Sequence, residues 1–114
     1  MAKDDYHVLM AKILVYLYAK MKGKKVPPAE EYICPFSKDF PISEEYLNEV
    51  LDGMTEHEFI KLHVVRAWGG DIVAKDVDNM KITLEGIEYL RDNSTIRKIV
   101  DTIPMAATIF ELFQ

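Results

Sequence analysis

Apolar side chains recur at intervals of three and four residues through the first part of the chain. Residues 3–22 contain no glycine or proline, and the positions that follow this spacing are Tyr6, Leu9, Met10, Ile13, Leu14, Leu17 and Met21. Such a period places the apolar groups on one wide face of an α-helix. Gly23 and a run of lysines come next, and both favour a helix end. The pattern predicts a helix over 3–22 that ends near Met21.

Prolines divide the next segment into a short helix and a connection. Pro27-Pro28 suits the first turn of a helix, where the missing N–H of proline is not needed, and residues 29–33 complete that helix. Two further prolines and mixed aromatic residues occupy residues 34–42. We expect an ordered connection there, anchored by Phe36 and Phe40.

A further amphipathic segment begins at Ser43. The Ser43 hydroxyl can cap free backbone N–H groups, and Glu44 and Glu45 suit the positive end of a helix dipole. An apolar stripe follows at Tyr46, Leu47, Val50, Leu51 and Met54. Together these signals predict a helix over 43–57.

Two β-rich runs come next, separated by glycines. One lies in residues 59–65 and the other in residues 72–77, with Trp68-Gly69-Gly70-Asp71 between them. Adjacent glycines permit the positive φ angles of a tight turn. The two runs should therefore pair as an antiparallel hairpin.

Another helix is predicted after the hairpin, with Thr83 as its cap. We expect Leu84, Ile87 and Leu90 to pack on the first helix, and Gly86 indicates a close approach of two backbones. Asp92-Asn93-Ser94 should end this helix.

The last segment is apolar on more than one helical face. We expect a helix from Thr95 to about Phe113, with a kink or break at Pro104. Two arrangements stay open: a homodimer formed through this helix, or a final segment that folds back over the first helix. The predicted dimer contacts are Ile96, Ile99, Val100, Ile103, Ile109, Phe110 and Phe113.

The order helix, short helix, helix, hairpin, helix is that of a winged helix. Asp5-Tyr6 at the start of the first helix, the string Lys81-Ile82-Thr83, the string Gly86-Ile87-Glu88-Tyr89-Leu90 and the pair Asn93-Ser94 give a more specific likeness. In these residues the chain resembles the YjcQ-like family, best over 78–99. The resemblance implies a small winged-helix protein of the kind often encoded in bacterial prophage regions. It brings no catalytic motif that could be transferred residue by residue.

We therefore expect one α+β winged-helix domain over residues 1–114, with a core in 1–93 and an additional C-terminal helix in 94–114. A chain of 114 residues suits a single domain. Its single cysteine, Cys34, excludes an internal disulfide, and its first residues lack a signal-peptide pattern, so the expected compartment is the cytoplasm. No uncharged run reaches the roughly 20 residues of a membrane span, so no membrane association is expected.

Candidate chemistry in the sequence is sparse. His57, His63 and Cys34 do not have the spacing of a zinc site, and Lys61 stands where the second histidine of a zinc-protease motif would be. Gly69-Gly70 lacks the other residues of a phosphate-binding loop. We predict a non-enzymatic protein with no metal, no cofactor and no small-molecule ligand.

Charge bears on the kind of macromolecule that would bind. The formal net charge is -5, and residues 39–60 carry seven acids with no lysine or arginine. Carboxylates on the third helix would repel DNA phosphates, although winged helices commonly place that helix in the major groove.

Any contact with double-stranded DNA should therefore run through cations elsewhere. The candidates are Arg66, Lys75, Lys61, Lys81, Lys22, Lys24 and Lys25, with Asn48 as a base-reading residue. A phage-related transcriptional regulator that binds DNA is the first expectation. The alternative is a protein-interaction adaptor that uses the acidic third helix or the C-terminal helix as its interface.

Overall fold

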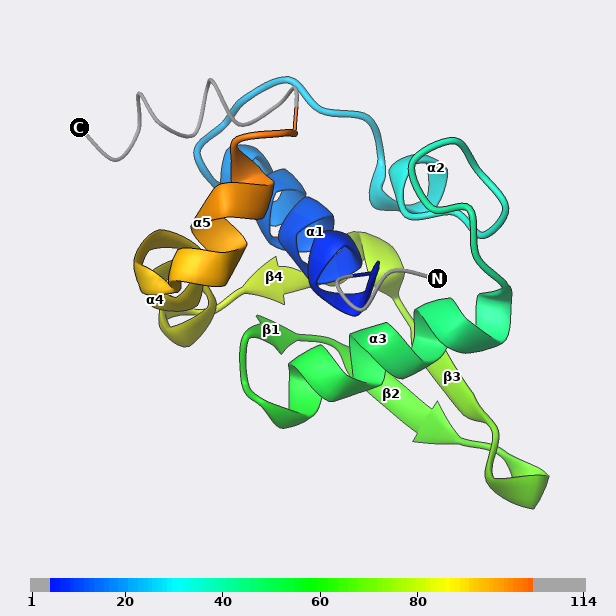
Figure 1. Ribbon diagram of the computed structural model, residues 1–114. Helices are drawn as coiled ribbons and strands as arrows, with labels where there is room; N and C mark the ends of the chain where they lie inside the picture. Colours follow the sequence, from blue (N-terminus) through cyan, green and yellow to red (C-terminus); the bar gives the residue numbers. More distant parts are fainter. Residues whose placement is uncertain (1–4, 104–114) are drawn as a thin grey trace.

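The first helix, α1 (Asp5–Met21), lies at the centre of the molecule. The computed structural model describes the chain from residue 5 to residue 103, except for the side chains of Asp5 and Lys75. Helices α3, α4 and α5 and strand β4 all contact α1 (Figure 1). From Leu9 to Ala19 every side chain except that of Lys12 is buried. The sequence predicted the helix, but its burial extends beyond one wide face because neighbours surround it.

The end of α1 forms at the predicted glycine. Gly23 adopts a positive φ of 81°, its N–H donates to the Lys20 carbonyl oxygen at 3.1 Å, and the Lys24 N–H donates to the Ala19 carbonyl oxygen at 3.0 Å. This pair of hydrogen bonds is the Schellman motif, which satisfies carbonyls that a helix end leaves free.

A short helix, α2 (Ala29–Tyr32), follows where the prolines predicted one. Pro28 is its N-cap and does not belong to its first turn as predicted, and the helix ends one residue before Ile33. The Tyr32 ring stacks on Tyr16 at 4.9 Å between centroids and meets Phe40 edge-on at 5.4 Å. Phe40 is buried and anchors the connection to the next helix. The prediction for Phe36 was wrong: it sits in a tight turn with a φ of 59°, and its side chain is 79% exposed.

The acidic helix is α3 (Glu44–Glu56), close to its predicted bounds. The Ser43 hydroxyl accepts a hydrogen bond from the Tyr46 N–H at 3.1 Å, which is the expected cap. Its apolar stripe faces the core, where the buried residues are Leu47, Val50, Leu51 and Met54.

Within residues 5–103, four short strands form two antiparallel pairs. β2 (His63–Arg66) pairs with β3 (Ile72–Lys75) in the predicted hairpin, and we call these strands and their turn the wing. The turn spans Trp68–Gly70, and the positive φ angles of Gly69 and Gly70 allow it. β1 (Ile60–Lys61) pairs with β4 (Lys81–Ile82), a pairing that joins the end of α3 to the start of α4. A single helical turn, Val77–Asn79, precedes β4.

Helix α4 (Leu84–Asp92) begins at the predicted cap, because the Thr83 hydroxyl accepts a hydrogen bond from the Gly86 N–H at 3.0 Å. A side chain at Gly86 would collide with the carbonyl oxygen of Phe59, so the predicted close approach is confirmed. Leu90 is fully buried and Ile87 is half-buried against the core. The prediction for Leu84 was wrong, because this side chain points to solvent and is 66% exposed.

The last described helix is α5 (Ser94–Val100), capped by the Asn93 side chain. It ends earlier than the predicted helix over 95–113, and residues 104–114 lie outside the described part of the chain. Ile96, Val100 and Ile103 are buried in the core of the single chain, and Ile99 packs against that core. The first three were therefore wrongly assigned to a dimer surface. Ile109, Phe110 and Phe113 lie beyond the described residues.

The three helices α1, α2 and α3, the wing beside α3, and the two added helices α4 and α5 form an α+β winged helix. In Figure 1 the wing projects away from the helices at the lower right, so its turn stands clear of the core.

Candidate functional site

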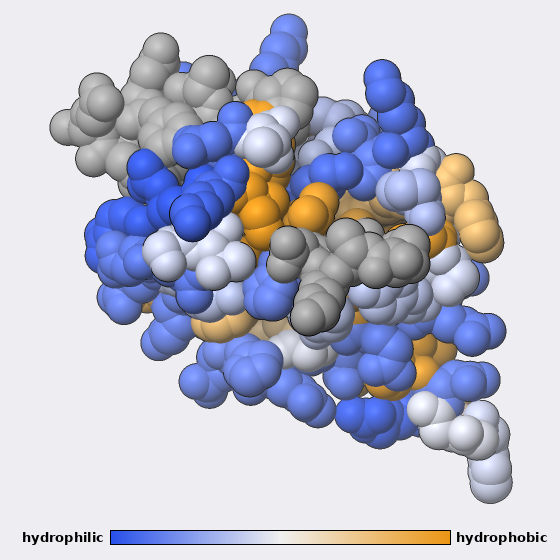
Figure 2. Space-filling view, in the orientation of Figure 1, coloured by the Kyte–Doolittle hydropathy of each residue, from blue (hydrophilic) through white to orange (hydrophobic). Residues whose placement is uncertain are grey.

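A groove runs between the first half of α3 and strand β3 of the wing. Carboxylates from Glu44, Glu45, Glu49 and Asp71 line it, with Tyr46, Asn48, Ile72 and Val73 also in its wall, and its volume is about 520 Å³. We call it the acidic groove. Figure 2 shows mainly hydrophilic residues over α3 in the orientation of Figure 1. The groove lies where a winged helix commonly meets DNA, but its charge is negative.

Local folding explains part of this charge. Glu44 and Glu45 stand in the first turn of α3, where the helix dipole favours carboxylates. Glu49 lies in the middle of the helix and Asp71 at the end of the wing turn, so the dipole does not account for them. The carboxylates gather in the groove because the wing folds back beside α3.

Arg66 points toward α3 rather than away from the protein. Its Nη2 lies 3.3 Å from a carboxylate oxygen of Asp52 and 3.5 Å from one of Glu56. Side chains alternate along a strand, so Arg66 shares the inward face with Ile60 and Val64. We predicted a phosphate contact for Arg66, but the structure pairs this cation with the acids of α3.

The two strand lysines lie on the opposite, outward face. Lys61 and Lys81 are directly across from each other in the register of β1 and β4, and both are exposed. His63 and Lys75 are the corresponding pair in the wing, with His63 exposed. The structure therefore brings Lys61 and Lys81 together and separates them from Arg66.

The remaining predicted cations follow α1. Lys22, Lys24 and Lys25 are all exposed, and the Lys22 Nζ lies 5.6 Å from the centroid of the Tyr18 ring. Asn48, predicted as a base reader, is half-buried and lines the acidic groove. The predicted DNA contacts are thus divided between an acidic side and a basic side.

The wing turn carries an aromatic residue that sequence reasoning did not single out. Trp68 is 100% exposed. It lies two residues before Gly70, which lines the acidic groove. A large aromatic ring held clear of the core is a typical anchor in protein interfaces.

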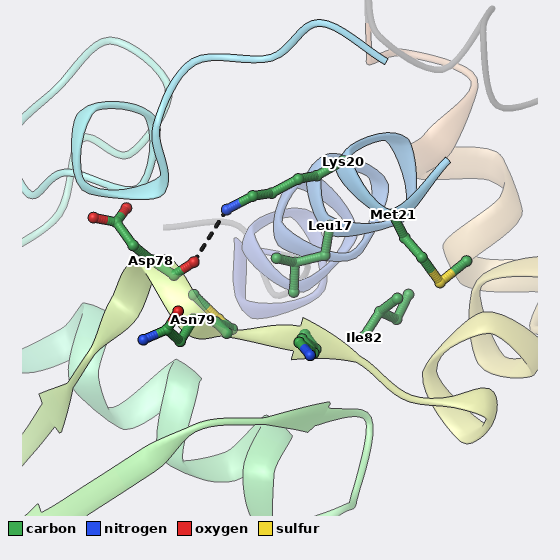
Figure 3. A pocket seen from close by; sticks show the side chains of 8 residues that line it. Leu17, Lys20, Met21, Asp78, Asn79 and Ile82 are labelled. Carbon is green, nitrogen blue, oxygen red and sulfur yellow. Dashed lines mark hydrogen bonds between the residues drawn. The ribbon is translucent and has the colours of Figure 1, made fainter. Parts of the chain in front are cut away.

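A second cavity lies between the end of α1 and strand β4 (Figure 3). Its volume is about 320 Å³, and its apolar walls come from Leu17, Met21, Met80 and Ile82. Lys20 and Lys81 also line it, so we call it the Lys20 cavity. Sequence reasoning missed it because its two walls come from segments that are distant along the chain, and no local pattern marks such a meeting.

Burial and nearby acids perturb the tyrosines around α1. Burial, with Asp39 and Tyr16 nearby, raises the pKa of Tyr32 to about 12. Burial also raises the pKa of Tyr6, with further contributions from Tyr46 and from carboxylates of α3. Burial is the largest cause of the raised pKa of Tyr6, and the carboxylates of α3 add to it.

The residues that the sequence analysis weighed for metal or catalytic chemistry all lie in the described part of the chain. No group of three or more His, Cys, Asp or Glu residues within 5–103 is arranged to hold a metal ion. His57 stacks on Phe59 at 5.7 Å between centroids, and Cys34 is half-buried next to the Pro35 carbonyl. No helix within these residues combines the length and apolarity that crossing a bilayer requires.

Comparisons with known proteins support the likeness that the sequence suggested. A family model described as YjcQ protein matches residues 11–107. Comparisons with curated proteins and with solved structures gave no match. The match extends the similarity from the segment 78–99 to most of the chain.

Proposed function

This chain belongs to the YjcQ family, and we propose that it is a non-enzymatic interaction module whose acidic groove binds a basic protein segment. The observation that carries the proposal is the pairing of Arg66 with Asp52 and Glu56. It directs the arginine of the wing, whose side chain is still 59% exposed, toward the acids of α3 and not into the groove. The groove beside it is lined by four carboxylates. Lysine or arginine side chains complement such a surface, whereas phosphates are repelled by it.

The apolar groups of the groove suit a peptide rather than a simple cation. Ile72 and Val73 lie beside the carboxylates. The exposed Trp68 belongs to the same wing turn as Gly70, which lines the groove. A segment that combines basic and apolar side chains would satisfy both kinds of contact. Charge complementarity would guide its approach, and the apolar contacts would contribute to holding it.

A second candidate function is binding of double-stranded DNA, with a role as a phage-related transcriptional regulator in the cytoplasm. The observation that favours it is the exposed pair Lys61 and Lys81. Like charges directly opposite in a sheet are unfavourable, and a phosphate between them would relieve the repulsion. In this candidate the wing and the strand lysines contact the DNA backbone, while the acidic groove faces away from it.

The homodimer is also a proposal. Among the predicted dimer contacts in the described residues, Ile99 is half-buried and the other three are buried. The remaining contacts would come from Ile109, Phe110 and Phe113. Sedimentation of the intact chain at micromolar concentration tests it, and a monomer mass would refute the dimer.

A binding titration separates the two candidate functions. Fluorescence anisotropy is measured with a labelled peptide of alternating lysine and leucine, and with a labelled mixed-sequence duplex, each at low and moderate salt. We expect saturable peptide binding that the triple variant Glu44→Gln, Glu45→Gln, Glu49→Gln weakens about tenfold, because each exposed carboxylate contributes up to about 1 kcal/mol.

The matched control is Glu30→Gln, Glu31→Gln, Glu88→Gln. These exposed acids also lie in a first helical turn and in a mid-helix position, but away from the groove. The control should bind the peptide like the parent. Tighter binding of the duplex than of the peptide, lost in Lys61→Gln with Lys81→Gln, would overturn the peptide proposal in favour of DNA.

A further inference from the structure

The Lys20 cavity is large enough for a small molecule. It opens between the last turns of α1 and the segment Asp78–Ile82, and its volume of about 320 Å³ is near the lower end of the usual range for ligand pockets, roughly 300 to 1,000 Å³. Figure 3 shows side chains from the helix and from the strand converging on the same space.

The floor of the cavity is apolar. Leu17, Met80 and Ile82 are buried there, and Met21 stands half-exposed at the mouth. Methionine side chains adapt their shape easily, so the walls can follow a flexible hydrocarbon chain. Such a floor favours an aliphatic group over a polar one.

Two cationic side chains and one neutral amide, that of Asn79, are among the polar groups that line the cavity. Lys20 comes from α1 and Lys81 from β4. The Lys20 ammonium donates one hydrogen bond, at 3.1 Å, to the backbone carbonyl of Asp78. An ammonium has three donors, so two remain for a ligand.

The acid of the lining points elsewhere. The Asp78 carboxylate accepts a hydrogen bond from the Glu30 backbone N–H at 3.4 Å, on the side of α2. Figure 3 shows this carboxylate directed away from Leu17 and Ile82. The cavity therefore combines an apolar floor with positive charge at its rim.

The free carbonyl groups at the C-terminal end of α1 oppose the binding of an anion, but only in part. A helix C-terminus repels anions through its free carbonyls. Here the Gly23 and Lys24 N–H groups bond two of them, and the exposed Lys22, Lys24 and Lys25 follow directly.

We propose that the Lys20 cavity binds a small amphipathic anion. Its aliphatic chain lies against Leu17, Met80 and Ile82, and its carboxylate lies between Lys20 and Lys81. The site is separate from the acidic groove, which takes the opposite charge, so it does not depend on the function proposed above. It adds a small-molecule ligand that the sequence gave no reason to expect.

Methionine methyl groups report on this site directly. Protein labelled with ¹³C at the methionine methyls is titrated with decanoate below its micelle concentration and observed by NMR. We expect saturable shifts of the Met21 and Met80 methyls, which line the cavity. Met10 and Met54 are buried in the core and do not line the cavity, so their methyl signals should not shift.

Charge variants test the role of the two lysines. The double variant Lys20→Gln with Lys81→Gln should bind decanoate about tenfold more weakly. Each substitution removes a charge-assisted hydrogen bond to the carboxylate of the ligand. The matched control is Lys38→Gln with Lys61→Gln, which removes the same charge at exposed positions that do not line the cavity. Lys61 lies directly opposite Lys81 in the sheet but does not line the cavity.

The result that supports the site is weaker binding in the first pair and parent-like binding in the control. If both double variants bind decanoate equally weakly, the effect depends only on net charge, and this result would overturn the proposal. Absence of saturable shifts at Met21 and Met80, or equal binding of decyltrimethylammonium, would overturn it as well.

Discussion

At the residue scale, Gly86 shows how one small residue decides the position of a helix. Its N–H bonds the Thr83 cap, and its α-carbon faces the carbonyl oxygen of Phe59. That carbonyl also accepts the Thr83 N–H at 3.0 Å, so it is fixed in place. Gly53 in α3 is different, because a side chain there would meet the tip of Tyr6, which can rotate away.

These two glycines give a matched prediction. Gly86→Ala should lower the free energy of unfolding by about 1 to 3 kcal/mol or more, because a backbone must move to admit the methyl group. Gly53→Ala should change it by less than about 1 kcal/mol, since the gain in helix propensity offsets the displacement of Tyr6. Urea denaturation measures both, and equal effects would contradict the packing described for Gly86.

Tyr32 gives a prediction about pH. Burial raises its pKa to about 12, so the folded protein keeps the proton where the unfolded chain has lost it. The resulting stability is fully present below about pH 10 and is lost as the pH rises toward about 12. Tyr32→Phe should lose less stability than the parent between about pH 10 and 12. Urea midpoints measured across that range check this, and parallel losses in both proteins would argue against it.

At the element scale, α4 has a sharply divided surface. Leu90 is fully buried while Leu84, at the first helical position, is 66% exposed. The spacing of Leu84, Ile87 and Leu90 predicted one packed face. The cap at Thr83 and the contact at Gly86 fix the rotation of the helix, and this rotation leaves its first leucine in solvent.

Leu90→Ala should therefore lower the free energy of unfolding by about 2 to 5 kcal/mol through the cavity it leaves. Leu84→Ala should change it by no more than about 0.5 kcal/mol, because no contact in the core is lost. Thermal or urea unfolding compares the two variants. A Leu90→Ala protein as stable as the parent would show that this part of the core is wrongly assigned.

The elements that were predictable from the sequence have local signals. Ser43 and Thr83 mark helix starts through their own hydroxyls, and Gly23 and the pair Gly69-Gly70 mark turns through their positive φ angles. The pairing of β1 with β4 has no such signal, because it depends on segments about 20 residues apart being brought together by the wing.

The candidate sites were less predictable for the same physical reason. The sequence did indicate the direction of the Arg66 side chain. Side chains alternate between the two faces of a strand, and Arg66 is an even number of residues from Ile60 and Val64, so it falls on the same face. The sequence predicted the acidic helix but not the groove. The groove also includes Asp71, which reaches it only because the wing lies beside α3. The Lys20 cavity arises from the packing of two distant segments and has no sequence pattern of its own.

At the scale of the whole molecule, the protein separates its charges. Carboxylates line the groove between α3 and the wing, and Arg66 forms an ion pair with Asp52 of α3. Lysines occupy the outward face of β1 and β4 and the end of α1. Under the proposed function, a basic protein segment binds the surface that winged helices commonly present to DNA.

Mapping the contact surface of the basic peptide tests this account most directly. A ¹⁵N-labelled sample is titrated with the lysine and leucine peptide, and backbone amide shifts are followed by NMR. We expect saturable shifts within residues 44–49 and 70–73, with the amides of Lys61 and Lys81 unchanged. Shifts confined to β1 and β4, or no saturable shift in the acidic groove, would contradict the proposal that this groove is the binding surface.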